Sequence, residues 1–303
     1  MIREGSFDDI PRAAELRQRA WPESIVTEDG TRHWLASAPA RAELALLAWE
    51  EADELLGWAT AARNWWASAP DGGILSITVD PSRRGEGIGT ALAEAADGHL
   101  DRLGVRTTRA GSLDEPGARA LAARRGFTEL AASAVSSVDP RTVEPRPVPA
   151  GVELVPLAAL DDPAPIHALD MELSRDIPNE DFEAIGLDEW KNLFWESPLI
   201  DGEASLVAFV DGELAGLTMI RIHPPSGRAQ NNLCGVRRAY RGRGLALLLK
   251  SHSLRRAAEL GAAIALTDND ETNAPMLAVN RRLGYSPFAR RLEWERSPAT
   301  SPP

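Results

Sequence analysis

The hydrophobic pattern of the chain switches repeatedly between the period of an amphipathic helix and that of a strand. One helix, three strands, and then helix, strand, helix and strand occur in the same order twice. In the first half we predict helices at residues 10–20, 87–103 and 115–125, and strands at 45–49, 54–62, 73–79, 105–110 and from Phe127. In the second half we predict helices at residues 166–175, 244–260 and 273–283, and strands at 205–210, 213–222, 229–236, 263–267 and from Tyr285.

Short motifs repeat in the same order as these elements. Residues 79–89 (VDPSRRGEGIG) recur as residues 236–246 (VRRAYRGRGLA). Upstream, residues 53–57 match residues 212–216, and downstream an Arg-Gly-Phe ending at Phe127 matches a Leu-Gly-Tyr ending at Tyr285. An internal repeat of this kind predicts two copies of one unit. Each copy is expected to be α/β, with a mixed, mostly antiparallel sheet flanked by helices.

Proline-rich segments mark the borders of the copies. Residues 139–151 hold four prolines, which neither a helix interior nor a central strand accepts, so an extended linker is expected there. We therefore predict a first half at residues 1–138 and a second half at 152–296. Residues 297–303 are expected to form a disordered tail.

Composition excludes several classes of function. The 303-residue chain has a net charge of −12, with acidic groups in excess in both halves, so duplex nucleic acid and anionic membranes are poor partners. One cysteine, Cys234, excludes an internal disulfide and cysteine zinc sites, and the five histidines lack metal-ligand spacing, so no metal is expected. No apolar run approaches the roughly 20 residues of a membrane span, and no signal peptide is recognised, so we expect a cytoplasmic protein.

The repeated glycine turn is the strongest chemical signal. Glycines between a strand and a helix let the backbone approach a ligand, and the unpaired amides of the helix favour an anion such as pyrophosphate. Neither copy ends in the Gly-Lys-Ser/Thr of a Walker A loop, and the turn follows a later strand of its unit, whereas in a Rossmann unit it would follow the first strand. A turn used only for tight packing is the alternative, but two occurrences at matched positions favour a ligand.

These two turns resemble the acetyl-CoA signature of the GCN5-related N-acetyltransferases, and residues 273–285 (NAPMLAVNRRLGY) resemble their second motif. The resemblance covers nearly the whole chain as a tandem pair, an arrangement similar to that of mycothiol synthases. It implies acetyl-CoA as cofactor, with pyrophosphate on the turn and pantetheine on the strand before it. The residues implied in the first half are Ile77, Thr78, Val79, Arg84, Gly85, Gly87, Ile88, Gly89 and Thr90. Those implied in the second half are Cys234, Gly235, Val236, Arg241, Gly242, Arg243, Gly244, Leu245, Ala246, Asn273 and Asn280.

The groups that move protons are poorly specified by the sequence. Many members of the resembled family place a tyrosine as acid where this chain has Ala122 and Asn280. We therefore expect the thiolate proton to come from water, or catalysis to be weak. As the base that activates an amine, Asp176 and Asp268 are the best candidates, and Asn280 is the remaining polar group at the expected site. Asn273 is either a pantetheine ligand or a helix N-cap, or both.

The halves are not equivalent, and this decides where we expect the chemistry. The first half has Glu115 and Pro116 where the second has Asn273 and Ala274, so we expect turnover in the second half and weak CoA binding, or only a structural role, in the first. Frequent carboxylates at residues 170–189 hint at a cationic amine acceptor. Trp190 and Trp195 are either core residues or a flat aromatic lid over an apolar or planar acceptor. We expect a monomeric or homodimeric N-acetyltransferase for a small-molecule amine. The alternatives are a non-catalytic acyl-CoA sensor and a protein N-acetyltransferase.

Overall fold

The computed structural model describes residues 1–65, 71–178 and 183–297. The strands are β1 (Ile2–Glu4), β2 (Ala45–Glu51), β3 (Glu54–Arg63), β4 (Gly72–Val79), β5 (Thr107–Leu113), β6 (Thr128–Val138), β7 (Val152–Pro156), β8 (Leu206–Val210), β9 (Glu213–His223), β10 (Arg228–Val236), β11 (Ile264–Asp270) and β12 (Ser286–Arg296). The helices are α1 (Ile10–Ala20), α2 (Glu28–Ala36), α3 (Ile88–Arg102), α4 (Pro116–Arg124), α5 (Ala164–Ser174), α6 (Leu187–Trp190), α7 (Leu245–Glu259) and α8 (Ala274–Arg282). Every predicted helix and strand is present within a few residues of its expected bounds, so the predicted repeat is confirmed.

The pattern missed four short elements: β1, α2, β7 and α6. The helix α2 has a clear local cause, since the Thr27 hydroxyl accepts a hydrogen bond from the Gly30 amide at 3.0 Å and caps its first turn. The short α6 continues into a single π-helical turn, Lys191–Trp195. The strands β1 and β7 lie at the two outer edges of the sheet, where three to five residues are too few to show a periodic pattern.

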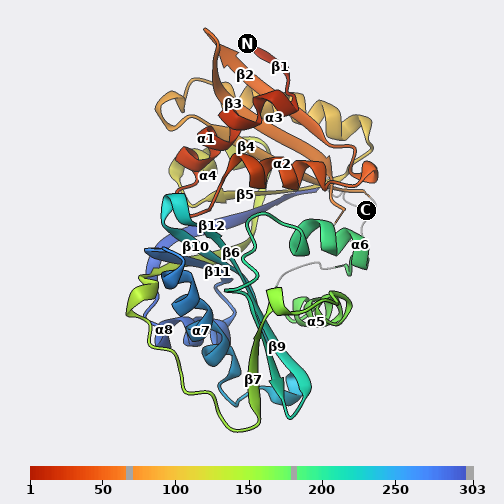
Figure 1. Ribbon diagram of the computed structural model, residues 1–303. Coiled ribbons are helices and arrows are strands. Elements are labelled where there is room, and N and C mark those ends of the chain that lie inside the picture. Colours follow the sequence, from red (N-terminus) through yellow and green to blue (C-terminus); the bar gives the residue numbers. More distant parts are fainter. Residues whose placement is uncertain (66–70, 179–182, 298–303) are drawn as a thin grey trace.

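All strands join in one twelve-stranded sheet that runs through both halves (Figure 1). The order across it is β1-β2-β3-β4-β5-β12-β6-β11-β10-β9-β8-β7. The last strand of each half has therefore crossed over: β12 pairs with β5 and β6, whereas β6 pairs with β11 and β12. The borders at residues 138 and 152 remain a prediction, and they do not divide the sheet, because the copies exchange their last strands.

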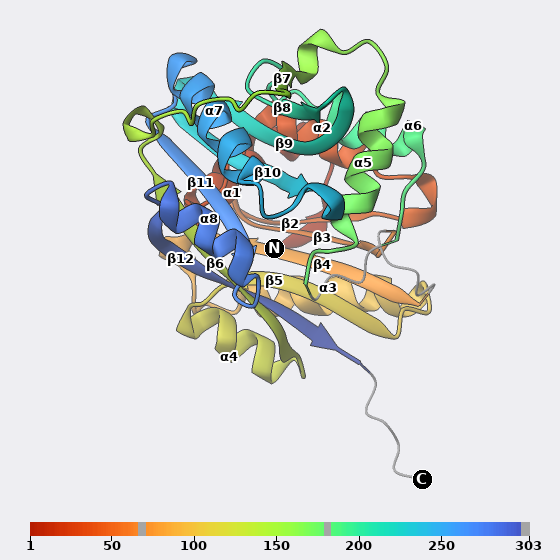
Figure 2. The same cartoon turned by 90° about the horizontal axis from the view of Figure 1, so that it is seen from below.

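Helices cover both faces of the sheet in each half. In the first half, α1 packs Ala13 and Leu16 near Trp58, whereas α3 packs Ile88 and Leu92 against Ala59. Neighbouring residues of a strand point to opposite faces, so α1 and α3 lie on opposite faces. In the second half, α7 packs Leu249 against Leu206 on one face, and α5 and α6 pack against Val207 on the other. The view in Figure 2 shows α7 and α8 on one side of β10 and β11.

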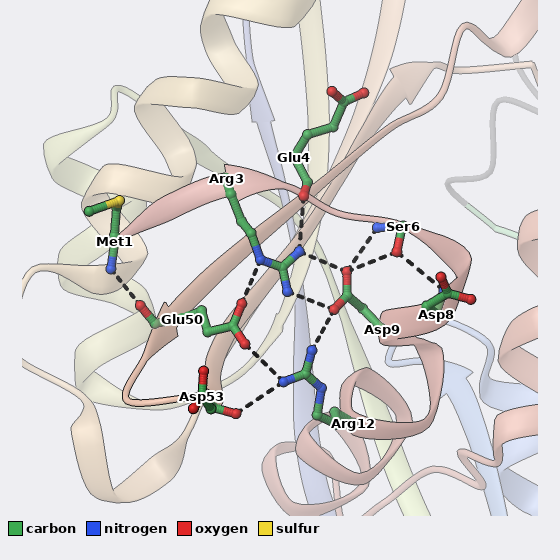
Figure 3. A network of polar contacts seen from close by, with 9 residues as sticks. All are labelled: Met1, Arg3, Glu4, Ser6, Asp8, Asp9, Arg12, Glu50 and Asp53. Atoms are coloured by element: carbon green, nitrogen blue, oxygen red, sulfur yellow. Dashed lines mark hydrogen bonds and ion pairs between the residues drawn. The ribbon is translucent and has the colours of Figure 1, made fainter.

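The beginning of the chain is held by a network of ion pairs (Figure 3). The Asp9 carboxylate accepts hydrogen bonds from Arg3 Nη2 at 2.7 Å and Arg12 Nη2 at 2.7 Å. Both arginines also contact Glu50 on β2, through Arg3 Nε at 2.5 Å and Arg12 Nη1 at 3.0 Å. Asp9 is buried, and its hydrogen bond from Arg3 holds the pKa of its carboxyl far below the usual range. The network ties β1, α1 and β2 together at the outer edge of the first half.

The segment between the copies follows the surface of the second half. Within residues 139–151 only a 3-10 turn at Pro140–Thr142 is regular. Its Arg146 amide donates to Ser251 Oγ at 3.1 Å, and its Arg146 carbonyl lies 2.7 Å from His252 Nε2, which fixes the segment along α7. Most of the expected tail lies outside the described residues. In the described parts of the chain, no helix has both the length and the apolar character that a membrane span requires.

Candidate active site

The two glycine turns have the same backbone geometry. Gly85 and Gly87 have φ of 87° and 89°, and Gly242 and Gly244 have φ of 77° and 81°. These values favour glycine, and a Cβ placed on any of the four would meet no atom within 4 Å. Neither α3 nor α7 has a side-chain cap, so their first amides face open space with no intrahelical partner. Each turn is thus built as an anion site at the positive end of a helix.

The strand before each turn parts from its neighbour. Parallel pairing of β4 with β5 ends at Leu75 and Ala110, and that of β10 with β11 ends at Asn231 and Thr267. Beyond these points β4 remains bonded only to β3, and β10 only to β9. One edge of residues 76–79 and of residues 233–236 is therefore free of pairing with the neighbouring strand. We call the space between β10 and β11 the second-half gap, and its inner end is the point where Asn231 and Thr267 pair.

In the first half the gap and turn open into one cavity of about 990 Å³. All nine first-half residues expected to contact the cofactor line it. Arg84 at its mouth forms an ion pair with Glu115 at 2.6 Å, so Glu115 neutralises the arginine of the turn. A cavity of this size does not favour the expectation that the first half is only a structural partner, and its binding of CoA remains a prediction.

The inner ends of the two gaps differ in chemistry. Ala93, Ala110 and Ala122 line the first-half cavity. Counted from the matched glycines, the second half has Lys250, Thr267 and Asn280 at the same positions. These side chains form a buried polar network: Lys250 Nζ donates to Asn280 Oδ1 at 2.7 Å and to Thr267 Oγ1 at 3.3 Å. Asn280 Nδ2 in turn donates to Asn269 Oδ1 at 2.6 Å. Polar chemistry is thus concentrated in the second half.

The structure argues against Asp176 as the base. Its carboxylate accepts hydrogen bonds from Arg238 and Arg241, both on the second-half turn. These bonds lower the pKa of Asp176 to about 2, so the carboxylate is a poor proton acceptor. The prediction failed because the sequence did not show that the two arginines of the turn fold back onto this aspartate.

Asp268 lies where a base is useful. It is the first β11 residue beyond the inner end of the second-half gap, and it faces the side of the sheet opposite to Thr267. Its Oδ2 accepts from Arg291 Nη1 at 2.9 Å, and its buried Oδ1 has no hydrogen-bond partner among the described residues. Arg291 therefore holds one oxygen of this carboxylate, and the other, within the described parts of the chain, is left without a partner at the inner end of the gap.

Three other expectations on single residues are resolved. Asn273 is an N-cap, since its Oδ1 accepts from the Met276 amide at 3.2 Å, and a pantetheine contact remains a prediction. Burial raises the pKa of the Cys234 thiol, and its contact with the cofactor remains a prediction. Trp190 is fully buried and donates to Asp170 Oδ2 at 2.7 Å, so it is a core residue and no lid.

The acidic segment at residues 170–189 lies partly outside the described residues. Within the described part, the carboxylates of Asp170, Asp176 and Glu189 all have hydrogen-bond or ion-pair partners, which weakens the hint of a cationic acceptor.

Two residues at the site were missed by the sequence reasoning. Lys250 is one of only two lysines and stands in the apolar run LALLLK, which was a usable signal. Glu23 follows α1, and no pattern in the sequence marks it as a buried residue. It is 1% exposed, neither of its carboxylate oxygens has a hydrogen-bond partner among the described residues, and burial raises its pKa. Arg291 Nη2 lies 3.8 Å from Glu23 Oε1, and Arg291 Nη1 contacts Asp268, so these two carboxylates share one arginine between the halves.

The site agrees with comparisons to known proteins. The profile of the Acetyltransferase (GNAT) family matches residues 10–127 and 171–285. The chain belongs to the GNAT acetyltransferase family. It is 34% identical to a mycothiol acetyltransferase of Clavibacter michiganensis over 80% of this chain and 76% of that protein, and 25% identical to one of Catenulispora acidiphila over 93% of each. A tandem GNAT protein from the clavulanic acid biosynthesis pathway superposes with a TM-score of 0.76 at 22% identity, covering 100% of this chain and 99% of that one.

Family membership confirms several of the expectations. The chain has the tandem GNAT fold, it is an N-acetyltransferase, and acetyl-CoA is its acetyl donor. The uncapped amides, the open glycines and the free strand edges fit the diphosphate and amide-bearing arm of that donor. The acceptor and the half that carries turnover are left to proposal.

A first prediction concerns Tyr285, the aromatic residue nearest the network. Its hydroxyl is buried without a hydrogen-bond partner among the described residues, and burial raises its pKa well above the usual range. We expect Tyr285→Phe to change kcat by less than about twofold, because a hydroxyl that contacts no polar group cannot serve as acid. A sharp loss of thiol release, with an unchanged circular dichroism spectrum, would show that the hydroxyl takes part.

Proposed function

We propose that the chain transfers the acetyl group of acetyl-CoA to a primary amine of a small molecule, with turnover in the second half. The single observation that carries this is the asymmetry of the two gaps. Both halves have the open turn, but at three matched positions of the inner end the second half has the polar side chains Lys250, Thr267 and Asn280. In the first half the matched positions are alanines, which bind no proton.

The second-half turn is suited to hold the donor. The amides of residues 242–246 would bind the diphosphate, and the free edge of residues 233–236 would pair with the arm. Arg241 Nε donates to the Val236 carbonyl at 2.9 Å, which fixes the turn against the end of β10. Acetyl-CoA supplies the acetyl group as a reactive thioester. An arm that followed β10 inward from Val236 would bring its sulfur toward the pair Asn231 and Thr267, where β10 and β11 meet.

An acceptor amine would approach from the opposite face. Asp268 and Glu23 meet there between the halves, and Asp268 lies directly at the inner end of the gap. A carboxylate at this position attracts an ammonium and takes its proton, which leaves a neutral amine to attack the thioester carbon. The new C–N bond replaces the C–S bond, and the sulfur leaves with the electron pair. Asp268 is therefore the proposed base.

The relatives support a small acceptor. They are named mycothiol acetyltransferases, and a small-molecule acceptor fits them better than a protein lysine or N-terminus. A non-catalytic acyl-CoA sensor is the second candidate, favoured by the large first-half cavity, which has alanines at the positions of Lys250, Thr267 and Asn280. A cytoplasmic location and a monomer or homodimer remain part of the proposal. Release of free thiol with a panel of amines distinguishes the candidates, since tight CoA binding without any turnover would favour the sensor.

Asp268→Asn provides the specific test of the base. We expect kcat to fall about 10²-fold, because general base catalysis contributes on this scale, and we expect the acid limb of the pH–rate profile to disappear. Asp176→Asn is the matched control and should keep the acid limb, since that carboxylate is held by arginines on the turn. An unchanged profile in Asp268→Asn would reject the role.

A further inference from the structure

Lys250 is a buried cation that no carboxylate neutralises. Lys250 is a residue of α7, and it is 1% exposed. Among the residues that the structure describes, no carboxylate forms an ion pair with it. The groups that face it come from four directions: Cys234 on β10, Thr267 on β11, Asn280 on α8 and the ring of Tyr285, whose centre is 5.0 Å from Nζ. All of these are uncharged in their ordinary state at neutral pH. Burial lowers the pKa of Lys250 to about 8.

An unpaired buried ammonium is costly, so its retention calls for a reason. Packing does not supply one, because Ala93 occupies the matched position of α3 and leaves the first-half cavity open. The position of Lys250 in the gap does supply a reason for a buried ammonium. Its Nζ is 3.3 Å from Thr267 Oγ1, and Thr267 is the last β11 residue that pairs with β10. The ammonium therefore lies at the inner end of the second-half gap, on the face opposite to Asp268.

We propose that the Lys250 ammonium neutralises and protonates the sulfur that leaves during acetyl transfer in the second half. The proposal rests on the proposed function, in which the arm of the donor reaches as far as the inner end of the gap. When the attacking nitrogen bonds to the carbonyl carbon, the C–S bond breaks and the sulfur takes its electron pair. One proton passes from Nζ to this sulfur and forms the free thiol. Asp268 has already taken one proton from the acceptor ammonium, so the second nitrogen proton, lost as the amide forms, passes to solvent. Asp268 then releases its proton to solvent and the neutral Lys250 regains one from it, so one proton is released in each turnover and charge and atoms balance.

The surrounding network supports this role. Asn280 Oδ1 accepts from Lys250 at 2.7 Å and is itself fixed by its bond from Nδ2 to Asn269 at 2.6 Å. Only two of the three donors of an ammonium are used by Asn280 and Thr267, so one N–H remains for a ligand. The first half has alanines at the positions of both Lys250 and Asn280 and offers no proton there. The same observation therefore explains why turnover belongs to the second half.

The chain offers a direct test because it has two lysines, Lys191 and Lys250. Protein labelled with ¹³C at lysine Cε should give two lysine signals, and Lys250→Met identifies the one from Lys250. We expect this signal to titrate near pH 8 in the free protein. Adding CoA should raise its midpoint, because a thiolate stabilises the ammonium, whereas desulfo-CoA should not. Equal midpoints with the two ligands, or a Lys250 signal unaffected by CoA, would overturn the proposal.

Kinetics provide the second measurement. Lys250→Met should lower kcat about 10²-fold with KM for acetyl-CoA changed less than about threefold, and the loss of activity above about pH 8 should vanish. Lys191→Met is the control, since Lys191 lies far along the chain in the π-helical turn. Lys250→Met removes a buried charge, so its melting temperature should not fall at pH 7. A kcat within twofold of wild type contradicts the proposal.

The two proposals fail separately. If CoA shifts the Lys250 titration but no amine yields thiol, the proposed turnover is wrong and the pairing with sulfur stands. If amines are acetylated and Lys250→Met is as active as wild type, the proposed function stands and the role of Lys250 is wrong. If CoA does not bind to the second half, both are wrong.

Discussion

Gly244→Glu is expected to reduce acetyl transfer at least about 10³-fold, since it combines two effects at the anion site. Gly244 has φ of 81°, a conformation that costs a side-chain-bearing residue roughly 1–2 kcal/mol. The new side chain would project into open space before the first amides of α7, where a Cβ meets no atom within 4 Å. Its carboxylate would therefore compete with the diphosphate for the amides and repel it. Thiol release at saturating amine measures the effect.

Gly87→Glu is the matched control in the first half. Gly87 has φ of 89° and the same open surroundings, so it carries the same strain and adds the same charge. We expect its turnover to remain within about twofold of wild type, because the first half has Ala93, Ala110 and Ala122 where the second half has its polar network. Loss of turnover in Gly87→Glu with retention in Gly244→Glu would assign the chemistry to the first half.

Leu292→Asp is expected to lower the free energy of unfolding by at least about 4 kcal/mol, because it places a carboxylate in a sealed core. Leu292 is 0% exposed and lies on β12, between Ser112 of β5 and Ala132 of β6. Since β12 belongs to the second copy but completes the first-half side of the sheet, we expect both halves to unfold in one transition. Denaturant unfolding followed by circular dichroism and by tryptophan fluorescence tests this.

Phe288→Asp on the same strand is the control, since Phe288 is 42% exposed. Its free energy of unfolding should change by less than about 1 kcal/mol. If Leu292→Asp instead gave two separated transitions, with the second half unchanged, the exchanged strands would not couple the halves.

The elements could be predicted from the sequence because each has its own period and its own end signals. The glycine turns are also local, and their φ angles follow from the need for glycine. The exchange of β6 and β12 could not be predicted. Alternation in a strand shows which side chains are buried but not which strand lies beside it. Both strands follow a helix and a Gly-aromatic pair at matched positions, so the two pairings look alike in the sequence.

The contacts of the groups proposed to move protons could not be predicted from the sequence either. Asp176 was expected as a base, but it is neutralised by arginines from residues 238 and 241, which are far away in the chain. Glu23 and Asp268 meet at Arg291 only because β12 has crossed into the first half's side of the sheet. Lys250 was visible as a lone charge in an apolar helix, yet its contacts with Thr267 and Asn280 depend on how α7 and α8 pack.

The most direct test of the account is a crystal structure of the full chain with acetyl-CoA. We predict that the diphosphate lies against the amides of residues 242–246, that the arm runs between β10 and β11, and that the sulfur lies beside Lys250 and Asn280. A donor found only in the first-half cavity, with β10 and β11 closed on each other, would contradict the account.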